Sequence, residues 1–178
     1  MERIIEIIYL LFILIFFISF TSIALAGILL TVPVPTPQKA VNQMLKIAKI
    51  KKGDKVYDLG CGDGRIIISA AKKFDAYAIG YEISILHFLI TKFKIKKEGL
   101  SSKVKVIYGN FYQKNFSDAS LITIFGIPNK MNKVGEIIQK SALPGTKIVS
   151  YAFPIPQFSP LKVVKLKNLA PIYLYQIT

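Results

Sequence analysis

The stretch Val-Tyr-Asp-Leu-Gly-Cys-Gly-Asp-Gly-Arg, at residues 56–65, decides the fold of this chain. A short apolar strand at 56–59 leads directly into Gly60, Gly62 and Gly64, and an apolar helical stretch follows from Ile66. Glycines let a backbone approach a ligand closely, and the first turn of a helix offers free N–H groups. The stretch therefore predicts a nucleotide-binding turn between a strand and a helix.

Strands and helical stretches alternate around this turn. This alternation predicts an α/β domain with a mostly parallel sheet and helices on its faces. The last two strands are joined by only a few residues, so we expect them to form an antiparallel hairpin. The predicted strands span 56–59, 76–81, 104–108, 121–125, 147–151, 161–167 and 172–177, and the predicted helices begin near residues 37, 66, 84 and 129.

Two carboxylates accompany the glycine turn and help to identify its ligand. Asp58 ends the first strand, and Glu82 follows 24 residues later at the end of the second, where a carboxylate can accept hydrogen bonds from ribose hydroxyls. A dinucleotide fingerprint counted from Gly60 needs Gly or Ala at position 65, but Arg65 stands there. Asp58 and Asp63 would also repel a pyrophosphate. The pattern favours a ligand without phosphate.

At this point the sequence resembles the class I S-adenosylmethionine-dependent methyltransferases. Asp58 to Arg65 is similar to their first motif, Gly80-Tyr81-Glu82 is similar to their second, and the expected strands match their seven-stranded Rossmann-like sheet. The resemblance covers residues 36–178. It implies a methyltransferase that uses S-adenosyl-L-methionine as its cofactor.

A narrower resemblance is carried by three segments. Val34-Pro35-Thr36-Pro37, Tyr57 to Gly60 and Val149 to Pro154 are similar to a small group of protein-lysine methyltransferases. That group includes archaeal enzymes of broad specificity and membrane-anchored forms that methylate the ATP synthase c-subunit. The resemblance implies a protein lysine as the methyl acceptor.

The class I resemblance also implies the cofactor-binding residues. They are Asp58 and the turn residues Gly60, Cys61, Gly62 and Gly64 for the methionine part, Glu82 for the ribose, and Asn110 for the adenine.

The acceptor is expected at the carboxyl ends of the fourth and fifth strands. Phe125, Tyr151 and Phe153 are candidates for an aromatic pocket that holds a lysine ammonium by cation–π attraction and helps to shed its water. The alternative is that Phe125 and Tyr151 are core residues at strand ends. Apolar walls lower the pKa of lysine, so no dedicated base is required and no catalytic residue is assigned.

The N-terminus predicts a membrane anchor. Residues 7–32 contain no charge and are dominated by Ile, Leu and Phe, whereas crossing a bilayer core of roughly 30 Å takes about 20 residues. We expect a tail at 1–6, a transmembrane helix at 7–32, a Pro-rich linker at 33–37 and the methyltransferase domain at 38–178. Thr36 is expected to cap the first domain helix. A cleaved signal peptide ending at Ala24-Leu25-Ala26 is the alternative.

Charge is concentrated outside the span. The first 31 residues hold one basic and two acidic side chains, so the remainder carries 23 basic and 8 acidic ones. This bias favours a single-pass protein with its domain on the cytoplasmic side, and an anionic lipid surface is an additional partner. All basic residues except Arg3 and Arg65 are Lys, which argues against nucleic acid as a partner because its readers favour Arg.

Cysteine and histidine are too scarce in this chain for a zinc site. Cys61 and His87 are the only residues of their kinds, which excludes an intrachain disulfide and a Cys/His zinc site, and we expect no metal.

Two other functions are compatible with the same pattern. A lipid or quinone-precursor methyltransferase is the main alternative, because the span and the basic surface bring the site to lipid. A non-catalytic, donor-binding membrane adaptor is the third possibility.

Overall fold

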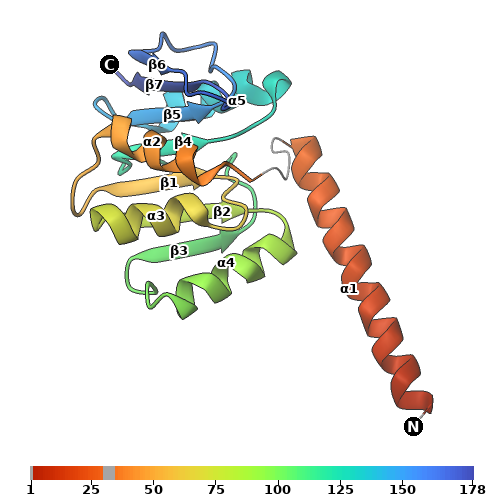
Figure 1. Ribbon diagram of the computed structural model, residues 1–178. Coiled ribbons are helices and arrows are strands. Elements are labelled where there is room, and N and C mark those ends of the chain that lie inside the picture. Colours follow the sequence, from red (N-terminus) through yellow and green to blue (C-terminus); the bar gives the residue numbers. More distant parts are fainter. Residues whose placement is uncertain (1, 30–34) are drawn as a thin grey trace.

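The computed structural model describes residues 2–29 and 35–178, and it has a seven-stranded sheet covered by helices, with a long N-terminal helix beside it (Figure 1). The strands are β1 (Lys55–Leu59), β2 (Tyr77–Glu82), β3 (Val104–Tyr108), β4 (Leu121–Ile124), β5 (Lys147–Tyr151), β6 (Lys162–Val164) and β7 (Ile172–Gln176). The helices are α1 (Glu2–Leu29), α2 (Gln38–Ala48), α3 (Arg65–Phe74), α4 (Ile85–Lys97) and α5 (Met131–Ser141), with a 3-10 turn η1 (Pro128–Lys130) before α5.

The sheet has the order β3-β2-β1-β4-β5-β7-β6. Strands β1 to β5 pair in parallel, and β7 pairs antiparallel with both β5 and β6. This order confirms the predicted α/β fold with a terminal antiparallel hairpin. The order of the parallel strands reverses between β1 and β4, and in sheets of this kind ligands bind at the carboxyl ends of the strands beside such a reversal.

Two apolar clusters hold the layers together. One joins α2, α3 and α4 to one face of the sheet, with residues such as Leu45, Ile67 and Leu121 fully buried. The other joins α5 to the opposite face, where Phe116 packs edge-on against Tyr57 at 5.4 Å between ring centroids. Both faces of the central strands are therefore buried, which explains why all four residues of β4 are buried and why three of them are apolar.

Most predicted element boundaries agree with the structure to within one or two residues. One prediction fails at α2: Pro37 is its N-cap, and the Thr36 side chain makes no capping hydrogen bond. The sixth strand, expected at 161–167, is limited to Lys162–Val164, the residues that pair with β7, and a turn with φ +61° at Asn168 follows.

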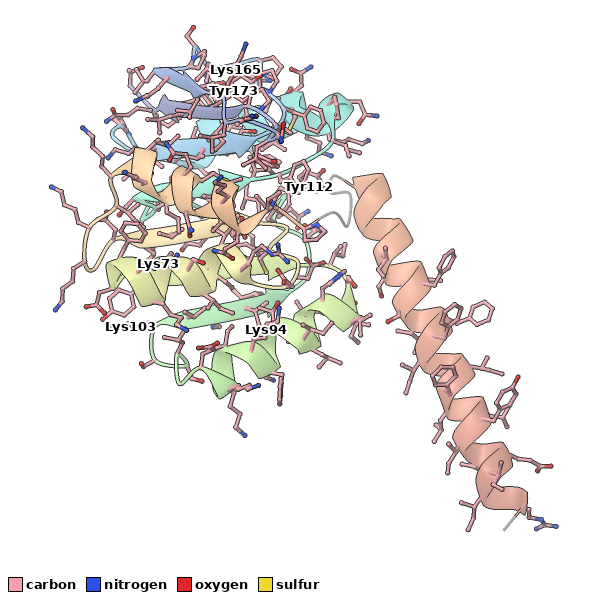
Figure 2. The ribbon with its side chains drawn as sticks, in the orientation of Figure 1. Lys73, Lys94, Lys103, Tyr112, Lys165 and Tyr173 are labelled. Atoms are coloured by element: carbon pink, nitrogen blue, oxygen red, sulfur yellow. The ribbon has the colours of Figure 1, made fainter. Side chains whose placement is uncertain are left out.

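The N-terminal helix stands apart from the two cores. α1 includes residues 2–6, which we expected as a tail, and Arg3–Ile23 is long and apolar enough to cross a membrane, with a mean hydropathy of 2.7 and no burial within the protein. Its side chains project outward around the helix (Figure 2). Such a helix is by itself weak evidence for a membrane span, because signal sequences share these properties. Residues 30–34, which include part of the expected linker, lie outside the described residues.

Candidate active site

The parallel strands bring most of the predicted site residues to one edge of the sheet. The glycine turn follows β1, Glu82 ends β2, Asn110 follows β3, and Phe125 and Tyr151 stand at the ends of β4 and β5. Carboxyl ends of parallel strands meet at one edge, so residues far apart in the sequence become neighbours. The structure brings the strand ends together as this rule predicts.

Backbone hydrogen bonds hold the glycine turn in its shape. The N–H groups of Gly60 and Cys61 both donate to the carbonyl oxygen of Tyr81, at 3.0 and 2.9 Å, and the N–H of Gly64 donates to the carbonyl of Cys61. Gly60, Gly62 and Gly64 all have positive φ, a conformation that favours glycine. These N–H donors serve the turn itself, so they are not directed at a phosphate.

Glu82 links the turn to the end of β2. Its carboxylate is buried, and it accepts hydrogen bonds from the N–H of Gly62 and the N–H of Ser84, both at 2.7 Å. A carboxylate has about four acceptor positions, so two remain for other donors such as hydroxyls. Glu82 therefore fixes the turn and still has the capacity to bind a ribose.

Asp58 is the second buried carboxylate, and it lies where the strand order reverses. The hydroxyl of Thr123 on β4 is 2.8 Å from Asp58 Oδ1. Burial raises the pKa of Asp58 to about 7; the bond from Thr123 opposes this shift, and the charges of Glu82 and Asp63 add to it. A cation beside Asp58 would favour its ionised form.

Asp63 does not act as a free negative charge at the turn. Arg65 binds it through two nitrogens at 2.8 and 3.0 Å, and the Nζ of Lys94 on α4 approaches it at 2.8 Å. Burial opposes the ionisation of Asp63, but the hydrogen bonds from Arg65 and Lys94 outweigh it and lower the pKa of this carboxyl well below its usual range. Our expectation that Asp63 repels a pyrophosphate therefore loses its basis.

Arg65 also connects the turn to the segment that follows the N-terminal helix. One of its guanidinium nitrogens donates to the backbone carbonyl of Thr36 at 2.7 Å. Arg65 thus occupies the first position of α3 and binds both Asp63 and the start of the domain. A glycine or alanine at this position, as in a dinucleotide site, makes neither contact.

Gly62 and Gly64 differ in their surroundings. A Cβ built on Gly64 would lie 2.5 Å from Cγ2 of Thr91, whereas a Cβ on Gly62 would meet no atom within 4 Å. Thr91 also donates its hydroxyl hydrogen to the carbonyl of Gly62 at 2.7 Å. Gly64 is required for packing of the turn against α4, and Gly62 borders open space that a ligand can occupy.

Cys61 is a packing residue within the turn. It is buried, and its sulfur occupies the space beside Gly80, where an added Cβ would lie 2.6 Å from Sγ. Burial raises the pKa of the Cys61 thiol well above its usual value, which keeps the thiol protonated. These features exclude a nucleophilic thiolate and leave its backbone as the part that can meet a ligand.

Asn110 lies close to Glu82 but has a local role as well. The N–H of Gly109 donates to the carbonyl of Glu82 at 2.8 Å, and Asn110 Oδ1 accepts a hydrogen bond from the N–H of Tyr112 at 3.2 Å. The Asn110 side chain is exposed. Its assignment to adenine stays a prediction.

The predicted acceptor residues form one aromatic group. The ring of Phe125 lies 5.1 Å from that of Tyr151, edge to face, and 6.3 Å from that of Phe153, stacked. Tyr151 is buried, and its hydroxyl accepts a hydrogen bond from the N–H of Ala170 at 3.3 Å, so it resembles a core residue. Phe125 and Phe153 are half-buried and can contact an acceptor.

Several residues that shape the site were missed by the sequence reasoning. Thr123 and Thr91 carry no recognisable motif and reach Asp58 and Gly62 only through the fold. Tyr112, two residues after Asn110, was also not singled out; the Nζ of Lys133 on α5 lies 4.6 Å from its ring centroid. Among these contacts, only the Asp63–Arg65 ion pair could be expected from the sequence, because its two residues are only two positions apart.

The residues fit S-adenosylmethionine better than a phosphate-containing cofactor. The turn offers open space at Gly62, two buried carboxylates and N–H groups already used internally. Carboxylates suit the hydroxyls and the cationic groups of the methyl donor, and they disfavour a pyrophosphate. The arrangement therefore suits a cationic nucleoside, and the assignment of the acceptor to Phe125 and Phe153 stays a prediction. Within the described residues, no cluster of His, Cys, Asp and Glu could hold a metal ion.

Comparison with known proteins agrees with this geometry. The family model of the ANTKMT methyltransferase domain matches residues 58–162. A protein-lysine N-methyltransferase from Saccharolobus islandicus is 40% identical over 148 residues, which cover 81% of this chain and 92% of that protein. The human lysine N-methyltransferase of the ATP synthase c-subunit is 29% identical over 127 residues, or 71% of this chain and 54% of that protein. The present chain thus spans about half the length of the human relative.

A solved structure shares both the fold and part of the sequence. The crystal structure of an RNA methyltransferase from Salinibacter ruber, in complex with S-adenosyl-L-homocysteine, has a TM-score of 0.78 and 32% identity, covering 81% of this chain and 94% of that one. That complex contains the demethylated form of the methyl donor.

Proposed function

This chain belongs to the family of the ANTKMT methyltransferase domain and is an S-adenosylmethionine-dependent methyltransferase, and on that premise we propose that it methylates protein lysine at a membrane. The donor supplies an electrophilic methyl group on a sulfonium. The assignment of the donor site rests on one observation. The buried Glu82 carboxylate accepts a hydrogen bond from the N–H of Gly62, and Gly62 borders open space.

The residues of the turn are assigned as follows. Glu82 holds the ribose hydroxyls, Asp58 and the backbone at 60–64 hold the methionine part, and Asn110 contacts the adenine. Two features support these assignments. Glu82 has acceptor positions left for ribose hydroxyls, and a cationic group of the donor beside Asp58 would favour the ionised carboxylate.

A lysine acceptor is supported by the relatives in Saccharolobus and human, both named for lysine methylation. Lysine must lose a proton before it attacks. Phe125 and Phe153 would exclude water from the amine and lower its pKa, so the chain needs to position a neutral amine and not to supply a base.

The membrane placement is supported by α1. An apolar helix of this length, followed by a domain rich in lysine, is typical of a single-pass anchor with its domain on the cytoplasmic side. The acceptor would then be a lysine near the membrane surface.

The test is to find where the methyl group goes. The full chain is incubated with membranes, total RNA and methyl-labelled donor, and label is counted in the protein, lipid and RNA fractions. We expect label in protein, none with Glu82→Gln, which loses an acceptor for a backbone N–H, and normal label with the exposed control Glu98→Gln. Label confined to lipid or RNA would contradict the proposal, and the Salinibacter relative makes RNA a necessary arm.

A further inference from the structure

The outer face of α4 exposes large apolar side chains. Leu86, Leu89 and Phe93 are 39%, 54% and 67% exposed, and their spacing of three and four residues places them in one stripe. The inner face of the same helix buries Thr91 and Ile95. The helix is therefore apolar on two sides, and only one of them is covered by the domain.

Basic residues flank this stripe. Lys92, Lys96 and Lys97 are exposed, and α4 contains no acidic residue. Lys94 differs because it turns inward and binds Asp63. We call the outward-facing set Leu86, Leu89, Lys92, Phe93 and Lys96 the α4 face. Leucine and phenylalanine beside lysine are typical of helices that lie in the interface of a membrane.

The position of α4 singles out this face. The N-terminal end of α4 approaches α1, and the two helices are in contact (Figure 1). Among the other exposed apolar side chains of the domain, Tyr108 on β3 lies beside α4, with its ring 5.7 Å from that of Phe88. Leu143 and Leu161 lie on other elements, as is normal for a protein surface. The combination of apolar surface, positive charge and the neighbouring span is thus specific to α4.

We propose that the α4 face docks on the headgroup region of an anionic bilayer beside the α1 span. The apolar stripe enters the interface, and the lysines bind anionic headgroups. This inference rests on the proposed membrane insertion of α1 but not on the chemistry of the site. α4 begins directly after its cap Ser84, two residues beyond Glu82, so docking holds the donor site close to the lipid surface. It would restrict acceptors to lysines that lie near that surface.

The absence of tryptophan from the chain provides a clean reporter. Phe93→Trp places a single tryptophan on the α4 face, and Leu161→Trp is the matched control, because Leu161 is 65% exposed and lies at the β6 edge of the sheet, opposite β3. The full chain is reconstituted into nanodiscs of phosphatidylcholine alone or mixed with phosphatidylglycerol, with brominated acyl chains as quenchers. Co-elution with the discs reports insertion.

We expect Phe93→Trp fluorescence to shift to shorter wavelength and to be quenched in anionic discs, and Leu161→Trp to stay unquenched. Adding Lys92→Gln and Lys96→Gln should lower the docked-to-undocked ratio about 25-fold, since each lysine near an anionic surface contributes about fivefold. Moderate salt should weaken the quenching in the same direction.

Docking would be overturned if the Phe93→Trp fluorescence were unquenched in anionic discs, or if both reporters were quenched equally. It would also be overturned if the shift of the Phe93→Trp fluorescence to shorter wavelength persisted in detergent and increased with protein concentration, because a second copy of the chain would then cover the tryptophan. Failure to co-elute with discs would overturn both insertion and docking. Donor binding measured in the same discs separates these failures from a failure of the proposed enzyme function.

Discussion

Asp58 shows how a single residue connects stability with ligand binding. Its carboxyl is buried, and its pKa is about 7 instead of the ordinary value near 4. Between about pH 4 and pH 7, the folded state therefore keeps the Asp58 proton, whereas the unfolded state has lost it. The contribution of Asp58 to stability is largest below about pH 4, falls as the pH rises toward 7, and is constant above that value.

The variant Asp58→Asn tests this linkage. Between pH 5 and 7 the free energy of unfolding of the native chain should lose about 1.4 kcal/mol per pH unit through this residue, and the variant should lack that slope. Asp63 and Asp118, whose pKa values are lowered, affect stability only below this window. Chemical denaturation of the full chain in detergent at several pH values measures the slopes. Parallel slopes in the two proteins would contradict the buried carboxyl.

At the scale of elements, the turn between β1 and α3 contains one glycine that is needed for packing and another that borders the expected ligand space. Gly64 packs against Thr91 of α4, whereas Gly62 faces open space. The two glycines have the same role in the motif but different physical reasons to be glycine.

Two alanine variants test that difference. Gly64→Ala should destabilise the chain by about 2–4 kcal/mol, because its Cβ meets Thr91 and its φ of +79° is unfavourable for alanine. Gly62→Ala should cost only about 1 kcal/mol but weaken binding of S-adenosylmethionine about tenfold or more, because its methyl group enters the ligand space. Thermal unfolding and calorimetric titration measure the two effects.

The matched control is Gly99→Ala. Gly99 has a similar φ of +68° and open space around it, but it lies after the far end of α4. It should share the small stability cost of Gly62→Ala and bind the donor normally. If Gly62→Ala also binds normally, Gly62 does not border the ligand.

The sequence predicted the elements and their order because local patterns determine them: the apolar strands, the glycine turns and the short final connection. It also brought Glu82 and the turn together, since both end parallel strands. It did not predict the contacts Asp58–Thr123, Arg65–Thr36 and Asp63–Lys94, which join residues with no shared motif. It misjudged Asp63 because the carboxylate is paired both with its sequence neighbour Arg65 and with Lys94, which only the fold brings near.

For the whole molecule, the organisation suggests how substrate choice arises. The proposed donor site lies at the edge of the sheet where the parallel strands end, while α1 and the α4 face are features of the molecular surface. Arg65, through Thr36, also binds the donor turn to the segment that leads to α1. We infer that the acceptor is selected by where the enzyme is held as well as by the aromatic residues at the site.

The most direct test of the central claim is mass spectrometry of membrane proteins from cells that carry the native chain, Glu82→Gln or Glu98→Gln. We predict peptides with methyl groups on the ε-nitrogen of lysine that are present with the native chain and Glu98→Gln and lost with Glu82→Gln. Lysine methylation that is identical in all three strains would contradict the proposed function.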